Sequence, residues 1–203
     1  MKKLILSVAA VFAFGFVSAQ DSSDGNGGFA KGDLYLTGTA NFFSEKTGDI
    51  KSDNFTVVPG VGYFVAENVA IEGSLGYTSA TDVQFFGNDF FEVKNSGFIA
   101  SAGVKYFWTP ANKFSLFVGG NLSYASIKTE VAGFNDDFTN NIIGVNVPVG
   151  LQYFVSNRFA ITSTWGGLGY TSSDNGGDGA EKTNGFDIGL DLSAINFGLL
   201  FKL

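Results

Sequence analysis

Hydrophobic and polar residues alternate along most of the chain after residue 33. Alternation with a period of two is the pattern of a β-strand whose two faces meet different surroundings. It predicts eight strands, at residues 33–42, 54–64, 69–78, 97–108, 114–127, 142–154, 159–170 and 185–203. The alternation slips at two places, which predicts a bulge at Gly166–Gly167 and a register change near Ser193–Ala194.

A Tyr-Phe pair, a short polar turn containing Asn and a further apolar stretch occur together three times. The pairs begin at residues 63, 106 and 153, so the spacings are 43 and 47 residues. Each spacing holds two strands and two connections, and the repeating unit is therefore a β-hairpin. Longer connections are expected at residues 43–53, 79–96, 128–140 and 171–184. Short turns at one end, longer loops at the other and aromatics beside the turns are typical of an antiparallel, up-and-down β-barrel that crosses a membrane.

Three charges decide which face of the strands points outward. Glu72, Lys105 and Asp191 all fall on the polar face, where they could not contact lipid without a large cost. The apolar face is therefore expected to contact hydrocarbon, as in a membrane barrel, and not to form the core of a soluble sandwich. Leu75, Leu122 and Val147 are expected on the lipid side.

The first residues have the pattern of a secretory signal peptide: a basic start, a short apolar run and a small-residue cleavage site before Gln20. The apolar run is shorter than the ~20 residues of a spanning helix. We therefore expect residues 1–19 to be a signal peptide read by the Sec pathway, residues 20–32 a flexible periplasmic lead-in, and residues 33–203 one barrel domain.

The chain has neither cysteine nor histidine. Disulfides, a lipid-anchoring cysteine and histidine-based catalysis are therefore not available. Paired carboxylates occur only at Asp136–Asp137 and Asp187/Asp191, where loop solvation is the simpler interpretation. We predict no catalytic residues, no cofactor and no metal site, and therefore no enzyme. The run from Asp174 to Gly179 resembles the start of a calcium loop but lacks its later ligands, and a flexible glycine-rich loop is the preferred interpretation.

Charge limits the partners. The net charge of −7 argues against nucleic acid. The four long connections carry twelve carboxylates against five lysines. Such an acidic surface either serves only solvation or holds divalent cations that bridge to lipid phosphates.

Two groups of residues are candidate functional sites. An aromatic girdle at one membrane–water boundary is predicted for Tyr63, Tyr106, Trp108 and Tyr153. Glu72 and Lys105 should lie at similar depth inside the barrel, near the short turns. One interpretation makes them an ion pair that plugs the lumen, with Gln152 and Thr162 as possible partners. The other leaves both charges hydrated in a wet lumen.

The signal peptide, the repeated Tyr-Phe turns and the aromatic-rich end at residues 195–203 resemble the small outer-membrane β-barrel family of Gram-negative bacteria. These are the OmpX- and OmpW-like, porin-like barrels, and the repeated motifs are similar to those of family members from Bacteroidetes. The resemblance implies an outer-membrane address and a C-terminal strand read by the barrel-assembly machinery. That signal would be carried by Phe197, Phe201 and Leu203, although the family usually ends on an aromatic residue.

Three functions remain open at this point. The first is a monomeric barrel in outer-membrane lipid with a structural or surface-interaction role through its acidic loops. The second is a narrow channel for small or apolar solutes, and the third a soluble periplasmic barrel that binds a ligand. A wide diffusion pore is excluded, because eight strands enclose an interior that side chains can fill.

Overall fold

The computed structural model describes residues 27–48, 50–86, 89–133, 137–176, 179–190 and 196–203. Within these ranges the regular structure consists of nine β-strands. Their bounds are β1 Leu34–Thr47, β2 Ile50–Phe64, β3 Val69–Phe86, β4 Asp89–Phe107, β5 Phe114–Val131, β6 Phe138–Phe154, β7 Phe159–Ser173, β8 Thr183–Leu190 and β9 Asn196–Lys202. No helix in the described part of the chain is long and apolar enough to cross a membrane.

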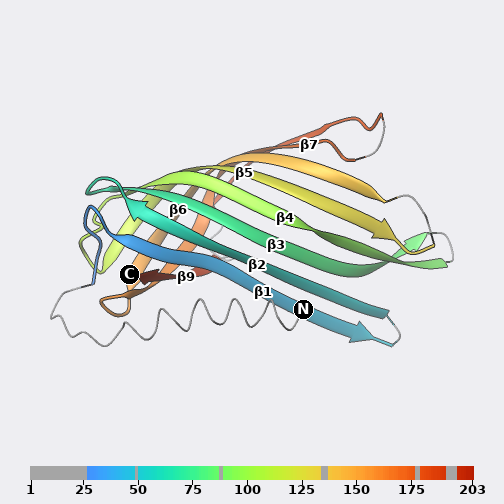
Figure 1. The fold of residues 1–203 in the computed structure, drawn as a ribbon, viewed down its shortest axis with the longest axis horizontal. Coiled ribbons are helices and arrows are strands. Elements are labelled where there is room, and N and C mark those ends of the chain that lie inside the picture. Colours follow the sequence, from blue (N-terminus) through green and yellow to red (C-terminus); the bar gives the residue numbers. More distant parts are fainter. Residues whose placement is uncertain (1–26, 49, 87–88, 134–136, 177–178, 191–195) are drawn as a thin grey trace.

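The strands form one closed antiparallel barrel (Figure 1). Each strand from β1 to β7 pairs with its neighbour in sequence, and β9 closes the ring by pairing with both β7 and β1. β8 pairs with residues 166–173 of β7, and β9 pairs with residues 159–164 of the same strand. β8 and β9 are therefore two parts of one barrel strand, and the predicted eight-stranded, up-and-down barrel is confirmed. The predicted register change near Ser193–Ala194 lies outside the described residues.

The two ends of the barrel differ. At the end that we call the turn end, residues 65–68, 108–113 and 155–158 connect consecutive strands, and the C-terminus lies there too (Figure 1). At the opposite loop end, the prediction of long connections was partly wrong. Residues 79–86 pair with residues 89–96, and residues 43–47 pair with residues 50–54. Their sequences do not alternate between apolar and polar residues, although their backbones are paired.

The predicted irregularity in β7 is present. Val149 pairs with Gly166 but the next residue, Gly150, pairs with Thr164, so Trp165 is the extra residue. Two residues on one strand against one on the other is the definition of a β-bulge. The bulge lies one residue before the predicted Gly166–Gly167 position.

The outer surface of the barrel is apolar. Phe42 and Leu75 are 77% and 71% exposed, and Leu122 is exposed as well. Val147 is half-buried. Besides the predicted girdle at the turn end, a second ring of large side chains lies nearer the loop end. It includes Tyr77, Phe98, Tyr124 and Tyr170. Along β4, Tyr106 and Phe98 are eight residues apart, which is about 26 Å at ~3.3 Å per residue. Because strands of outer-membrane barrels tilt by ~35–45° from the membrane normal, this length corresponds to about 20 Å of height, somewhat less than the ~25 Å apolar band that two aromatic girdles flank.

Candidate functional site: the barrel lumen

The lumen is filled at the turn end by a layer of aromatic side chains. Phe64, Phe107 and Phe154 are the second residues of the three Tyr-Phe pairs, and each is at most 1% exposed. Tyr35 of β1 and Phe117 of β5 belong to the same layer. The rings of Phe64 and Phe107 are 5.3 Å apart and those of Phe107 and Phe117 are 5.6 Å apart, within the range of favourable aromatic contacts. We call these five residues the floor of the lumen.

The floor explains why the Tyr-Phe pair repeats. Successive residues of a strand point to opposite faces, so one residue of each pair faces out and the other faces in. Tyr63, Tyr106 and Tyr153 are between 43% and 46% exposed and lie on the outside with Trp108. Tyr106 and Trp108 make an edge-to-face contact at 5.6 Å. The sequence analysis interpreted only the tyrosines; the phenylalanines beside them close the inside of the barrel.

The structure brings the two predicted lumen charges together directly above the floor. Lys105 Nζ lies 2.8 Å from Glu72 Oε2 and donates to Oε1 at 2.9 Å. The Tyr35 hydroxyl also donates to Glu72 Oε1, at 2.5 Å. Lys105 Nζ lies 4.9 Å from the centre of the Phe117 ring, so the ammonium also contacts an aromatic face. The side chains are 22% and 19% exposed, and their charges are therefore neutralised by each other more than by bulk water.

The partners of this pair differ from those predicted. Tyr35, which the sequence analysis did not single out, bonds the carboxylate. Gln152 is fully buried, and neither its Oε1 nor its Nε2 has a hydrogen-bond partner among the described residues. Gln152 is thus not a partner of the pair. Thr162 does not bond to it either, but it lines the same cavity.

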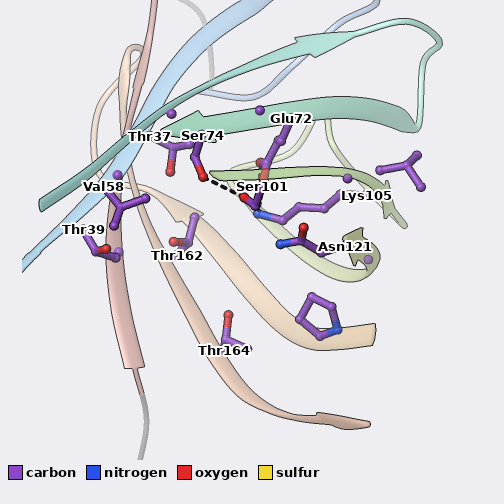
Figure 2. Close-up of a pocket in the computed structure, with 18 of the residues that line it drawn as sticks. Thr37, Thr39, Val58, Glu72, Ser74, Ser101, Lys105, Asn121, Thr162 and Thr164 are labelled. Atoms are coloured by element: carbon purple, nitrogen blue, oxygen red, sulfur yellow. Dashed lines mark hydrogen bonds and ion pairs between the residues drawn. The ribbon is translucent and has the colours of Figure 1, made fainter. Parts of the chain in front are cut away.

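A cavity of about 250 Å³ lies above the pair (Figure 2). Its wall is made mostly of glycines, hydroxyl-bearing side chains and the Glu72–Lys105 pair, with Val58, Val104, Asn121 and Pro148 as the other lining residues. Ser74 and Ser101 bond to each other at 2.7 Å across its side, while the buried Asn121 Oδ1 has no partner among the described residues. Inward-facing glycines create the space: a Cβ on Gly119 would lie 3.2 Å from both Lys105 and Pro148. The cavity is large enough for several waters, each of which takes ~30 Å³ of liquid volume.

The segment before β1 covers the turn end of the lumen. Phe29 is 2% exposed, and its ring packs on Phe64 at 4.5 Å and on Tyr35 and Phe154 at 5.0 Å each. Its backbone N–H donates to Pro110 O at 2.7 Å. Residues 27–32 belong to the predicted lead-in; residues 27–29 are packed into the barrel mouth, whereas residues 30–32 are exposed. The flexibility of the lead-in stays a prediction, and its residues 20–26 lie outside the described residues.

The C-terminal residues proposed as an assembly signal lie on β9 and just after it. Phe201 pairs with Leu36 and with Phe159, and the Phe197 backbone pairs with Ser163. Leu203 is exposed and its N–H donates to Leu34 O. Their role in assembly stays a prediction.

At the loop end, acidic side chains are engaged with nearby donors. Lys128 Nζ lies 2.7 Å from both Asp137 and Glu130, and the hydrogen bond to Asp137, then that to Glu130, raises the pKa of this lysine. Asp174 accepts hydrogen bonds from the Asn141 backbone at 2.7 Å and from its side-chain amide at 2.8 Å. These two bonds, in that order, lower the Asp174 carboxyl pKa. In the described ranges, no three His, Cys, Asp or Glu side chains are grouped to hold a metal ion.

Three comparisons relate the chain to known proteins. No curated protein matches the chain. The N-terminal β-barrel domain of Pseudomonas aeruginosa OprF is 15% identical, with a TM-score of 0.49, over 86% of this chain and all of that one. Ail, the attachment invasion locus protein of Yersinia pestis, is 14% identical, with a TM-score of 0.44, over 85% of this chain and 99% of that one. The family model described as the outer membrane protein beta-barrel domain matches residues 7–199. The chain therefore belongs to the outer-membrane β-barrel protein family, and it is a transmembrane β-barrel of the outer membrane.

Proposed function

We propose that this protein is a non-enzymatic outer-membrane barrel with a closed lumen, which has a structural or surface-interaction role through its acidic hairpins. The observation that carries the proposal is the aromatic floor beneath the Glu72–Lys105 pair. An eight-stranded barrel is just wide enough for side chains to fill it, so the floor together with the Phe29 ring that packs on it leaves no aqueous path. Because the protein is located in the outer membrane, the alternative of a soluble periplasmic ligand-binding barrel is not retained.

The surface role is supported by the length and charge of the hairpins at the loop end. β3 and β4 contain 18 and 19 residues, whereas a membrane-spanning strand needs only ~9–11. The paired strands therefore continue well beyond the lipid. With twelve carboxylates against five lysines in the four connections, this projecting surface is acidic and suits a cationic partner or bridging cations. In this arrangement the turn end faces the periplasm.

Solute flux into liposomes tests the closed lumen. Vesicles that contain the folded protein should be as impermeable to small neutral sugars as empty vesicles, while a sixteen-stranded porin in matched vesicles supplies the positive control. Heat-modifiable migration of the recovered protein on gels verifies that it is folded. Sugar entry that depends on the amount of folded protein would favour the narrow channel in place of the closed barrel.

A further inference from the structure

The segment Gly27–Asp33, which we call the strap, crosses the mouth of the barrel at the turn end. At its start, Gly27 lies against Phe154 and the backbone of Ser156, where an added Cβ would be 2.7 and 2.8 Å away. Gly28 lies against the backbone of Ala111 so closely that any side chain would collide with it. The strap thus contacts the β6–β7 turn and the β4–β5 turn before it reaches β1, and Figure 1 shows it at the same end as these turns.

Both ends of the strap are fastened. Lys202 Nζ on β9 lies 2.5 Å from Asp33 Oδ2 and donates to Gly28 O at 2.9 Å. The same ammonium lies 5.7 Å from the centre of the Phe29 ring. The Asp33 carboxylate also accepts from the Ala30 N–H at 2.7 Å, and Gly32 N–H donates to Phe64 O at 2.9 Å. Lys202 therefore ties the strap to the last strand of the barrel.

The Phe29 ring packs between floor residues from opposite walls of the barrel. It contacts Phe64 of β2 and Phe154 of β6. In the ring of barrel strands, with β8 and β9 taken as one, β2 and β6 are four steps apart in either direction, so they are opposite walls. The five floor residues are attached to strands of the wall itself, whereas Phe29 is carried by a segment outside the barrel. The central part of the closure is therefore the part that can leave without unpairing a strand.

We propose that the strap is a stopper, and that withdrawal of Phe29 joins the 250 Å³ cavity to the turn end and makes the lumen permeable to small ions and small neutral polar solutes. The solute class follows from the lining of glycines and hydroxyls and from the mutual neutralisation of Glu72 and Lys105. The inference rests on the closed resting lumen proposed above, and it adds which residue closes that lumen.

Two variants displace the stopper in different ways. Phe29→Ala removes the ring, and Gly28→Ala forces the strap away from Ala111 without changing any residue of the lumen. Phe42→Ala removes a phenylalanine from the lipid-facing surface, and Ala30→Ser changes an exposed strap residue; these are the matched controls. Trypsin cleavage after the exposed Lys31 reports strap release independently of conductance.

Ion conductance of the folded proteins in planar bilayers is the readout. Phe29→Ala and Gly28→Ala should each raise the mean conductance at least tenfold over the wild type and speed cleavage at Lys31, whereas the two controls should match the wild type. Faster cleavage at Lys31 without added conductance would overturn the stopper but leave the closed-lumen function intact. A wild type that already conducts as well as Phe29→Ala would overturn both. If Phe29→Ala does not fold, Gly28→Ala with its Ala30→Ser control decides the question.

Discussion

Tyr63 and Phe64 are adjacent in the chain but lie on opposite sides of the barrel wall: Tyr63 is 43% exposed on the outside, and Phe64 is fully buried in the floor of the lumen. The same division holds for Tyr106 and Phe107 and for Tyr153 and Phe154. A two-residue motif thus places one amphipathic ring at the lipid–water boundary and one apolar ring in the closure, at the same depth.

The two positions should differ in their contribution to stability. Phe64→Ala leaves a cavity among packed rings and should lower the free energy of unfolding by about 3–5 kcal/mol. Tyr63→Ala removes a ring that is already half exposed and should cost clearly less. Urea titration of the two variants in the same liposomes measures the difference. Equal losses at both positions would contradict the assignment of the two faces.

The ion pair should behave as a coupled unit. Glu72→Gln and Lys105→Met each leave a charged partner poorly satisfied and should cost about 1–3 kcal/mol. The double variant should recover part of that loss, with a coupling energy of about 0.5–3 kcal/mol. Tyr35→Phe serves as the conservative comparison, because it removes only the hydroxyl group that donates a hydrogen bond to Glu72. Purely additive losses in the unfolding titrations would show that both charges are simply hydrated.

The lipid-facing surface gives a third prediction. Leu75 is 71% exposed on the outer wall, so Leu75→Arg should destabilise the barrel by about 2–4 kcal/mol in a bilayer, the cost of a charge near the midplane. Asn146→Ser, on the opposite face, should have a small effect. Unfolding in liposomes checks both. If Leu75→Arg lowers the free energy of unfolding no more than Asn146→Ser does, Leu75 does not contact hydrocarbon.

Acid should loosen the connection between β7 and β8. The hydrogen bonds from Asn141 lower the Asp174 carboxyl pKa below its ordinary value. A carboxyl with a depressed pKa in the folded state stabilises that state fully above its ordinary pKa of ~3.9, and the contribution is lost as pH falls through the lowered pKa. Hydrogen-exchange protection of the Asn141 amide should therefore be constant near neutral pH and fall in this acidic window. Asp174→Asn should abolish the change; protection that stays constant down to pH 2 (about two units below that ordinary pKa) would contradict it.

The sequence predicted the features that depend on local alternation. Strand number, outward positions such as Leu75 and Leu122, and the bulge beside Gly166 all follow from which residues share a face. The same alternation placed Glu72 and Lys105 on the inner wall of neighbouring strands, and the structure shows them as an ion pair there.

The alternation along a strand shows which residues point inward, but it does not show which inward residues meet across the barrel. Tyr35 is near Glu72 because β1 and β3 flank the same strand, a relation that no spacing in the chain displays. The Phe29 strap has no periodicity, because it is a short segment of turns and single contacts. The paired hairpins at the loop end were interpreted as loops because their sequences do not alternate between apolar and polar residues.

Single-channel recording of the wild-type protein in planar bilayers tests the closed lumen most directly. Folded protein, verified by its heat-modifiable migration before fusion and after recovery, should give no stable conductance steps above the bare bilayer, because the aromatic floor and the Phe29 ring leave no aqueous path. Frequent, stable steps whose number rises with the amount of folded wild-type protein would contradict the closed lumen.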